Sequence, residues 1–380
     1  MKTYQHHFNG GQWIDHKGSE GLDASKCQLA LAFGSRECIV QPGVFDHIRS
    51  KYPNANIVFS STSGEILGDN VYDDSVVVTA VAFDKTEVRC VSTNIKQHGN
   101  SYETGIFLMK QLETNGLNAV FVISDGAHVN GSELVAGLNE NNPSNVPVTG
   151  GLAGDAARFQ KTMTGLNQVP TEGNVIAVGF YGSHLLVGHG SFGGWDEFGP
   201  ERTITRSEKN VLYEIDGKNA LELYKQYLGD YVNELPGSAL LFPLSLREKG
   251  SDENLVRTIL SINEADKSMT FAGNLPEGNT VRLMKANFDK LIEGASDAAT
   301  YSFAGIRNMK PELAILISCV GRKLILNERT EEELQAAKEI LGAGTVITGF
   351  YSYGEISPFN PSSTCELHNQ TMTITTFTEI

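Results

Sequence analysis

The chain has few basic residues, few cysteines and no long apolar segment. Its 30 lysines and arginines stand against 45 acidic residues, so the formal net charge is −15 at pH 7. Proteins that bind nucleic acids usually present a basic surface, and this balance argues against such a partner. The five cysteines are odd in number and show no CxxC spacing, which predicts reduced thiols rather than a disulfide framework.

The longest apolar runs, such as Ser75–Phe83 and Ala239–Leu246, are far shorter than the ~18 residues that a membrane-spanning helix requires. Residues 1–15 lack the apolar segment of a secretory signal. Hydrophobic residues make up 40% of the chain and charged residues 20%, a composition that excludes general disorder. We therefore expect a soluble cytoplasmic protein without membrane insertion.

Three similar units of strand, helix and strand recur along the chain, and repetition of this kind indicates one supersecondary structure used several times. A predicted hairpin follows each of the first two units (Val76–Phe83 with Val88–Ser92, and Asn174–Tyr181 with His184–Gly190), and a closing strand, Thr371–Phe377, follows the third. The predicted units are Leu29–Phe33, Val44–Lys51 and Asn56–Ser60; Ala119–Ser124, Ser132–Asn139 and Val146–Thr149; and Leu313–Ser318, Thr330–Leu341 and Thr345–Thr348.

The pattern predicts a mixed α/β fold with much antiparallel sheet, in two halves that form one body. Residues 1–25 are polar and glycine-rich, and we expect a loose N-terminal arm there. The two halves are predicted at residues 26–217 and 218–380. The break between them is expected between Gly217 and Pro236, after the Asp216-Gly217 turn.

Each unit ends in a glycine followed by a carboxylate: Gly64-Glu65, Gly154-Asp155 and Gly354-Glu355. Glycine allows backbone N–H groups to approach a ligand closely, and ligands usually bind at strand ends of α/β sheets. The alternative is that these glycines only form tight turns.

No catalytic signature is present. The GHGSFG segment at 188–193 matches a dinucleotide-binding pattern but is followed by loop residues rather than a helix, so we reject it. HExxH, zinc-ribbon, Walker and GxSxG patterns are absent from the sequence. We expect a protein that is not an enzyme; the rival hypothesis is an enzyme with Cys319 as nucleophile, near Arg322 and His368.

Several motifs resemble the FIST (F-box and intracellular signal transduction) family. GGLAGD (150–155), TITR (203–206) and LYEIDGKNAL (212–221) are similar to the FIST N-terminal domain. SCVGRK (318–323), GFYSYGEISP (349–358) and ELHNQTMTIT (366–375) are similar to the FIST C-terminal domain. The resemblance implies a cytoplasmic bacterial sensor of small ligands such as amino acids. A subset of the family resembles haem-containing nitric-oxide sensors that act on a partner histidine kinase in a two-component system. The resemblance of this chain to that subset implies a similar partner, a histidine kinase or another signalling protein.

The predicted ligand site combines the glycine-rich turns with polar residues of the C-terminal motifs. Arg322 is expected to clamp a ligand carboxylate or to pair with Glu355, and Glu65, Asp155 or Glu355 to hold an ammonium group. The predicted ligand-binding residues are Gly150, Gly151, Gly154, Asp155, Cys319, Arg322, Tyr351, Tyr353, Glu355 and Asn369.

A haem b cofactor needs an axial ligand, usually a histidine in an apolar pocket. His189 and His368 are the candidates, with His128 third, and for each a hydrogen-bonded structural histidine is the alternative. No metal other than a haem iron is expected. We predict haem-based nitric-oxide sensing, with a haem-free sensor of an amino acid or another small metabolite as the alternative.

Overall fold

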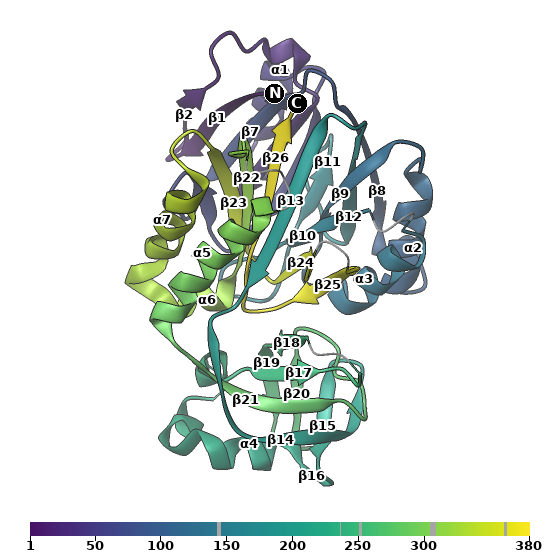
Figure 1. Cartoon of the computed structure of the whole chain (residues 1–380), viewed down its shortest axis with the longest axis vertical. Coiled ribbons are helices and arrows are strands. Elements are labelled where there is room, and N and C mark those ends of the chain that lie inside the picture. Colours follow the sequence, from purple (N-terminus) through teal and green to yellow (C-terminus); the bar gives the residue numbers. More distant parts are fainter. Residues whose placement is uncertain (143–145, 236, 251–252, 305–308, 361–362) are drawn as a thin grey trace.

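The computed structural model describes residues 1–142, 146–235, 237–250, 253–304, 309–360 and 363–380. Within them the protein has a large body of three six-stranded sheets and a small domain with an eight-stranded sheet. Figure 1 shows the body above and the small domain below. With 25% helix, 43% strand and largely antiparallel pairing, the predicted mixed α/β class is confirmed.

Each sheet of the body is built around one of the three predicted strand–helix–strand units. In every unit two parallel strands are joined by helix, and a third strand pairs antiparallel with the first. The first strand of each unit is mostly apolar because both of its faces are buried. The units are β3 (Leu29–Gly34), α1 (Val44–Lys51), β4 (Asn56–Ser61) and β7 (Val76–Ala82); β9 (Leu117–Ser124), α3 (Gly131–Glu140), β10 (Val148–Leu152) and β12 (Asn174–Tyr181); and β22 (Leu313–Cys319), α6 (Val320–Leu326), α7 (Thr330–Leu341), β23 (Val346–Ser352) and β26 (Met372–Glu379).

In each unit, the strand that follows the second parallel strand leaves the unit's own sheet and joins the edge of another unit's sheet. β5 (Glu65–Leu67) pairs with β23, β24 (Gly354–Pro358) pairs with β10, and β11 (Thr164–Leu166) pairs with β4. The three units therefore exchange edge strands in a closed cycle. A single apolar core, which includes Phe33, Phe121 and Phe350, is shared by all three sheets.

The two predicted hairpins are wrong. β7 and β8 (Glu87–Asn94) lie in different sheets, because β8 pairs with β12. In the same way β13 (Leu185–Phe192) pairs with β26 rather than with β12. A short connection requires only that two strand ends lie close together. Here each short connection joins strands of neighbouring sheets, and each of these strands forms its hydrogen-bonded pairs with a strand from another part of the chain.

The predicted loose arm is also wrong. β1 (Lys2–Asn9) and β2 (Gln12–Gly18) form a hairpin, and β1 pairs with β7 from Lys2↔Ala82 to Phe8↔Val76. His6 and Phe8 are buried in this hairpin. Pairing with the edge of β7 satisfies the backbone groups of this polar segment and fixes it to the body.

The remaining elements cover the sheets of the body. α2 (Ser101–Gln111) packs on α3, where an added Cβ on Gly137 would lie 2.0 Å from the Tyr102 carbonyl oxygen. α5 (Phe288–Ala304) packs on β13 and β26, and β6 (Asn70–Tyr72) and β25 (Cys365–His368) extend two of the edges. Short 3-10 turns lie at Ala24–Lys26, Ile95–Gln97, Gly229–Glu234, Gly237–Leu241 and Asn327–Arg329.

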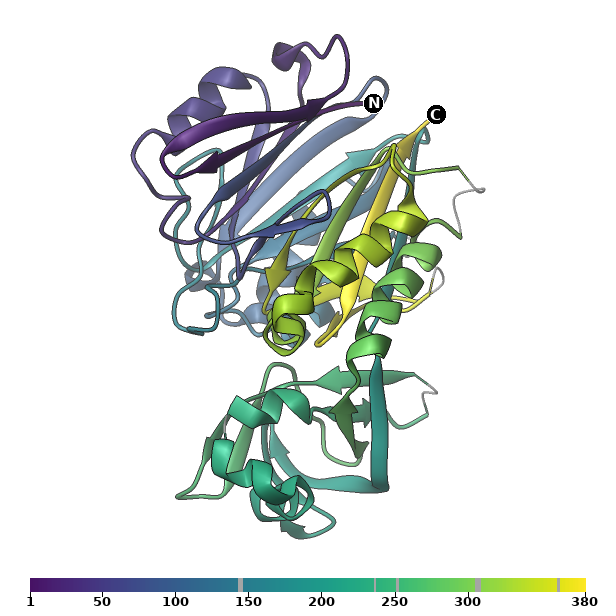
Figure 2. The same ribbon diagram turned by 90° about the vertical axis from the view of Figure 1, so that its left-hand side faces the viewer.

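The small domain is inserted between β13 and α5 and has its own apolar core. Trp195 and Ala286 are register partners, so the chain enters and leaves it on adjacent strands (Figure 2). The predicted boundary at 217/218 falls in its β15–β16 hairpin, and Pro236 lies outside the described residues. Its elements are β14 (Trp195–Glu208), β15 (Val211–Ile215), β16 (Lys218–Asn219), α4 (Ala220–Leu228), β17 (Leu244–Arg247), β18 (Asn254–Arg257), β19 (Ile259–Asn263), β20 (Ser268–Phe271) and β21 (Thr280–Ala286).

Candidate ligand-binding site

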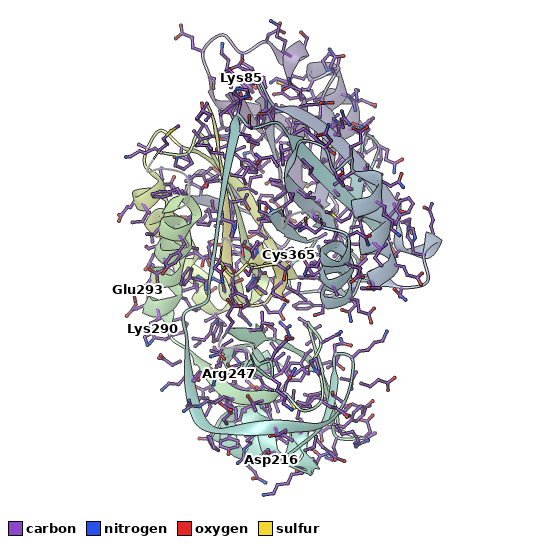
Figure 3. The ribbon with its side chains drawn as sticks, turned by 45° about the vertical axis from the view of Figure 1, so that its right-hand side comes forward. Lys85, Asp216, Arg247, Lys290, Glu293 and Cys365 are labelled. Carbon is purple, nitrogen blue, oxygen red and sulfur yellow. The ribbon has the colours of Figure 1, made fainter. Side chains whose placement is uncertain are left out.

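Two cavities lie at the carboxyl ends of the parallel strands of the body. The inter-domain cavity, of about 340 Å³, lies between the body and the small domain. The charged cavity, of about 550 Å³, lies between the ends of β3, β4 and β22. In Figure 3 Cys365 marks the lower part of the body, and Arg247 and Asp216 mark the small domain below it.

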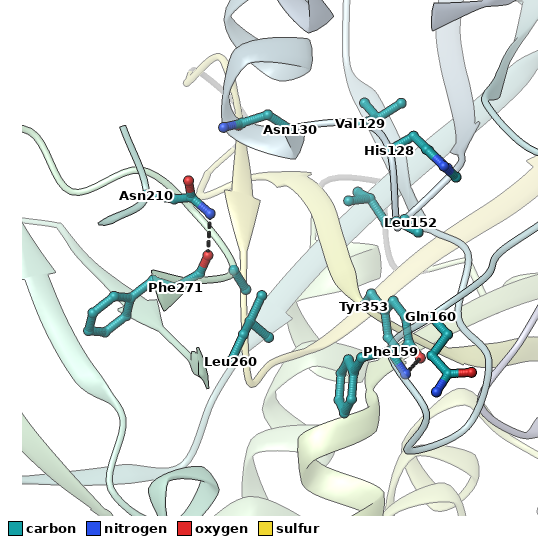
Figure 4. Close-up of a pocket in the computed structure, with 13 residues that line it drawn as sticks. His128, Val129, Asn130, Leu152, Phe159, Gln160, Asn210, Leu260, Phe271 and Tyr353 are labelled. Carbon is teal, nitrogen blue, oxygen red and sulfur yellow. Dashed lines mark hydrogen bonds between the residues drawn. The ribbon is translucent and has the colours of Figure 1, made fainter. Parts of the chain in front are cut away.

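The inter-domain cavity takes its walls from both parts of the protein. The body contributes the loop between β9 and α3, the end of β10, and the loop that follows it; the small domain contributes the residues around β20 (Figure 4). The lining residues are Gly126, Ala127, His128, Val129, Asn130, Leu152, Phe159, Gln160 and Tyr353 from the body, and Asn210, Leu260, Phe271 and Ala272 from the small domain.

Buried Asp125 holds the loop between β9 and α3 in place. Its carboxylate accepts hydrogen bonds from the backbone N–H groups of Ala127 (2.8 Å), His128 (2.7 Å) and Gly173 (2.8 Å). These bonds satisfy backbone donors that would otherwise point into the cavity, and they fix the loop before the helix begins.

Polar contacts join the small domain to the body beside this cavity. The Asn130 side chain donates to the Asn274 side chain at 2.9 Å, and the Asn274 N–H donates to the Ser132 hydroxyl at 3.1 Å. Arg257 donates to the carbonyl oxygen of Leu367 at 3.0 Å, and Lys209 pairs with Glu133 at 2.9 Å. A small apolar cluster, in which Met284 of the small domain packs against Leu291 and Leu326 of the body, adds to these polar contacts. Interfaces between domains of one chain are typically more polar than a core and allow relative motion.

Asp155, a predicted ligand-binding residue, organises the loop that separates the two cavities. It is fully buried, pairs with Arg36 at 2.8 Å, and accepts hydrogen bonds from the Tyr353 hydroxyl and the Lys161 N–H. The same loop carries Phe159, whose ring stacks on Tyr353 at 4.6 Å. Of the predicted residues, Tyr353 lines the inter-domain cavity and Asp155 supports it from behind.

The charged cavity carries side chains of both signs, among them Glu65, Asp73, Arg158 and Lys323. Lys323 donates to the carbonyl oxygen of Ser63 at 3.0 Å and pairs with Asp73. An added Cβ on Gly64 would lie 2.5 Å from the Lys323 ammonium nitrogen. The lysine side chain can move, but the φ of +139° at Gly64 favours glycine in this turn.

Glu65 and Glu355 occupy equivalent buried positions in their units. Each accepts a hydrogen bond from a hydroxyl three residues earlier, and a second from a hydroxyl just before the third strand of its unit. Burial raises the pKa of both carboxyl groups to about 8. Glu355 lines neither cavity, so its predicted role as a ligand residue has no support in the geometry.

The glycines of the second turn have packing roles. An added Cβ on Gly150, where φ is +145°, would lie 1.9 Å from the Val122 carbonyl oxygen. At Gly151 it would meet Ile317 at 2.8 Å, and at Gly154 the Ser63 hydroxyl at 2.3 Å. Gly150 needs glycine because its φ turns an added Cβ toward the neighbouring strand β9 of its own unit, whereas Gly151 and Gly154 lie where residues of the other two units approach closely.

Arg322 does not clamp a ligand and does not pair with Glu355. It is fully buried and donates to Glu333 at 2.8 Å and to the carbonyl oxygens of Gly193 and Leu291. The Tyr351 hydroxyl donates to the same Glu333 at 2.7 Å. The predicted arginine clamp is corrected to an internal ion pair that joins α6, α7 and α5.

Cys319 and Asn369 are buried outside both cavities. Burial raises the pKa of the Cys319 thiol, so the reactive thiolate is disfavoured. The Asn369 side chain donates to the carbonyl oxygen of His368 at 3.0 Å. Neither residue is placed to contact a ligand in the two cavities.

The predicted axial ligands do not fit a haem. The ring of His368 is fully enclosed, its Nε2 lies 2.9 Å from the Ser357 carbonyl oxygen, and Phe359 packs against it at 4.7 Å. Burial lowers the pKa of His368 to about 4. His189 lies within β13, and neither histidine lines the two cavities. His128 lines the inter-domain cavity, but its Nδ1 lies 3.3 Å from Asp125.

Sequence reasoning missed the residues of the small domain altogether, because their contribution depends on how the two parts dock. Phe159 was also missed, although an aromatic residue in a polar loop five positions after a glycine was a visible signal. Among the described residues no cluster of three or more His, Cys, Asp or Glu side chains is arranged for a metal ion. No described helix has the length and apolarity to cross a membrane.

The fold and its cavities define a two-part protein with a ligand-sized space between the parts. The FIST N domain matches residues 28–218 and the FIST C domain matches residues 220–358. The chain belongs to the FIST family, whose domains sense small ligands in signal transduction and are ligand-binding rather than catalytic.

The chain is also similar to uncharacterized protein MJ1623 of Methanocaldococcus jannaschii. The two are 24% identical over 357 residues, which cover 82% of this chain and 66% of the relative. The chain thus spans slightly less than two thirds of the relative's length.

Proposed function

We propose that this protein is a non-catalytic sensor of a small metabolite that binds in the inter-domain cavity. The observation that carries the proposal is that both parts of the protein line this cavity. A ligand there makes contacts that depend on the position of the small domain, and it therefore favours one position over others.

The size and location of the cavity support this assignment. A volume of about 340 Å³ suits a small molecule. The cavity lies at the carboxyl ends of β9 and β10, where ligands of α/β sheets usually bind. The two parts are joined by polar contacts, such as Asn130 with Asn274, and by one small apolar cluster around Met284 and Leu326, whereas their main cores are separate.

At a finer level, the signal passes from the small domain to a partner, a histidine kinase or another signalling protein of the cytoplasm. Haem-based nitric-oxide sensing is the less favoured ligand hypothesis, because His189 and His368 do not face the cavity. The visible spectrum of protein incubated with haemin separates the two: a Soret band lost in both His189→Ala and His368→Ala supports haem, and a colourless protein supports a haem-free metabolite sensor.

Two tryptophan substitutions test the location of the site. Ala127 and Ala157 are both exposed; the first lines the inter-domain cavity and the second lines the charged cavity. We would screen free amino acids, nucleosides and nucleobases for a rise in melting temperature of the wild type and of both variants. A ligand at 100 times its dissociation constant adds about 2.7 kcal/mol of stability.

We expect a ligand that stabilises the wild type and Ala157→Trp but not Ala127→Trp. A ligand whose effect is lost only in Ala157→Trp would place the site in the charged cavity and contradict the proposal. Reproducible turnover of a metabolite that disappears in Cys319→Ala would contradict the non-catalytic assignment.

A further inference from the structure

The two cavities differ in the charge of their walls. None of the described residues that line the inter-domain cavity is lysine, arginine, aspartate or glutamate, whereas the charged cavity contains all four kinds. A buried ion without a partner is costly, so a wall of neutral groups rejects charged ligands. The inter-domain cavity therefore favours a neutral molecule.

The aromatic pair Phe159 and Tyr353 forms one wall of this cavity (Figure 4). The rings are nearly parallel, with an interplanar angle of 19° and centroids 4.6 Å apart. The Tyr353 hydroxyl accepts a hydrogen bond from the Phe159 N–H at 2.9 Å, which fixes the loop behind the rings. Phe159 remains 42% exposed, so one face of its ring is open to a ligand.

The backbone of Phe159 provides an independent observation. Its φ is +52°, a region that bulky residues rarely adopt. Such strain persists only where the surrounding structure imposes it, and it is concentrated at ligand clamps and active sites. Here Asp155 imposes it by accepting hydrogen bonds from the N–H groups of Gln160 and Lys161.

The polar side chains of the cavity are mostly carboxamides. Gln160 lies beside the aromatic wall, and Asn130 and Asn210 lie across the cavity from it (Figure 4). The Asn210 side-chain amide donates to the Phe271 carbonyl oxygen at 2.8 Å, and the Asn130 side chain donates to Asn274. Carboxamides carry both donors and acceptors, and they match the edges of heterocycles that carry N–H and C=O groups side by side.

We propose that the inter-domain cavity takes a neutral, planar heterocycle with amide-like edges, whose ring stacks on the open face of Phe159. This inference rests on the proposed function and names the ligand class of the same site. Phe159 is the residue that selects for a flat ring, and the absence of lysine, arginine, aspartate and glutamate from the described lining selects against an ion.

The test uses probes that differ in charge or planarity alone. Nicotinamide is compared with nicotinate, adenosine with adenosine 5′-monophosphate, and nicotinamide with the non-planar cyclohexanecarboxamide, by calorimetric titration of the full-length protein. We expect at least one neutral planar probe to bind, and its charged or non-planar counterpart to bind about tenfold more weakly or worse.

Three variants assign the effect to Phe159. Phe159→Leu retains an apolar side chain without a ring and should weaken binding of the neutral probe about two- to tenfold. Phe159→Tyr retains the ring and should bind as the wild type does. Tyr301→Leu removes an aromatic residue that is 57% exposed on α5, away from the cavity, and serves as the matched control.

Three outcomes would overturn the inference: equal binding of charged and neutral probes, unchanged binding in Phe159→Leu, or no binding of any neutral probe at about 10 mM. If another compound binds in a manner abolished by Ala127→Trp but indifferent to Phe159→Leu, the proposed function stands and this inference fails. If a neutral probe depends on Phe159 but not on Ala127, the site lies on the loop alone and the proposed function fails.

Discussion

Glu65 and Glu355 show how single residues tie the exchanged strands to their units. Each carboxyl group follows a glycine at the point where the chain crosses to another sheet, and each is held by two hydroxyl groups. Burial favours the protonated, uncharged form of such a carboxyl group, which links two segments of the chain through its hydrogen bonds. The pattern of glycine and carboxylate in the sequence therefore marks the strand crossings and not a ligand contact.

The pH dependence of stability should reveal this uncharged form. Burial raises the pKa of Glu65 to about 8 in the folded protein, from 4.5 for an exposed glutamate. The stability that Glu65 contributes is complete below pH 4.5 and is lost as the pH rises through 8. The unfolding free energy of the wild type should therefore fall between about pH 5 and pH 8. In Glu65→Gln, which cannot ionise at this position, that fall should be smaller by on the order of 2–4 kcal/mol.

Urea denaturation at several pH values measures the effect of Glu65→Gln. Glu339→Gln, an exposed carboxylate on α7, is the control and should leave the pH profile of the wild type unchanged. An identical pH profile for Glu65→Gln and the wild type would show that Glu65 is ionised in the fold.

Arg322 is a buried residue whose structural role could not be predicted from the sequence. Its planar guanidinium donates to Glu333 and to two backbone carbonyl groups at once, a geometry that an ammonium group cannot reproduce. Arg322→Lys should therefore lower the free energy of unfolding by about 3 kcal/mol. Arg206→Lys, at an exposed position on β14, should change it by less than about 0.5 kcal/mol. Equal effects in chemical denaturation would refute a buried multidentate pair.

At the scale of the elements, the close crossing of strands explains the glycines of β10. Gly150→Ala would place a methyl group 1.9 Å from the Val122 carbonyl oxygen at a φ of +145°. We expect a loss of about 3 kcal/mol or more, from overpacking and backbone strain together. Gly217 also has a positive φ, +68°, but no atom lies within 4 Å of an added Cβ there. Gly217→Ala should therefore lower the free energy of unfolding by only about 1–2 kcal/mol. Melting temperatures of the two variants compare the effects, and similar losses would contradict a packing role at Gly150.

The strands and helices of the repeated units were predictable, but their partners were not. Apolar runs such as Leu29–Phe33 and Leu313–Ser318 identify buried strands because a strand with both faces buried is apolar along its own short sequence. Which strand lies beside β5, β11 or β24 depends on contacts far apart in sequence, and the local pattern carries no such information. The ligand site was missed for the same reason, since four of its thirteen lining residues come from the small domain and reach the site only when the two parts dock. Tyr353 was found because its motif marks a turn at a strand end.

At the scale of the whole molecule, the body and the small domain depend on each other to different degrees. The three sheets of the body share one core and exchange strands, so no sheet can unfold or separate without disrupting the other two. The small domain has a separate core and is connected by two adjacent strands, by polar contacts and by one small apolar cluster around Met284 and Leu326. This difference allows one part to move while the other stays fixed, which is the property that a sensor requires.

Excision of the small domain tests this division of labour. Asp196 and Lys285 are register partners on β14 and β21, so a two-residue Asn-Gly turn can replace residues 197–284 without stretching the chain. Trp195, which donates to the Gln370 carbonyl oxygen at 2.9 Å, and Asp196, which pairs with Lys290, remain in place. The shortened protein should unfold in one cooperative transition because the shared core is intact. It should bind no ligand that Ala127→Trp abolishes in the full chain, because the walls formed by Asn210 and Leu260 are gone. Unchanged binding by the shortened protein would show that the body alone forms the site, and a product without a cooperative transition would show that the small domain is part of the folding unit.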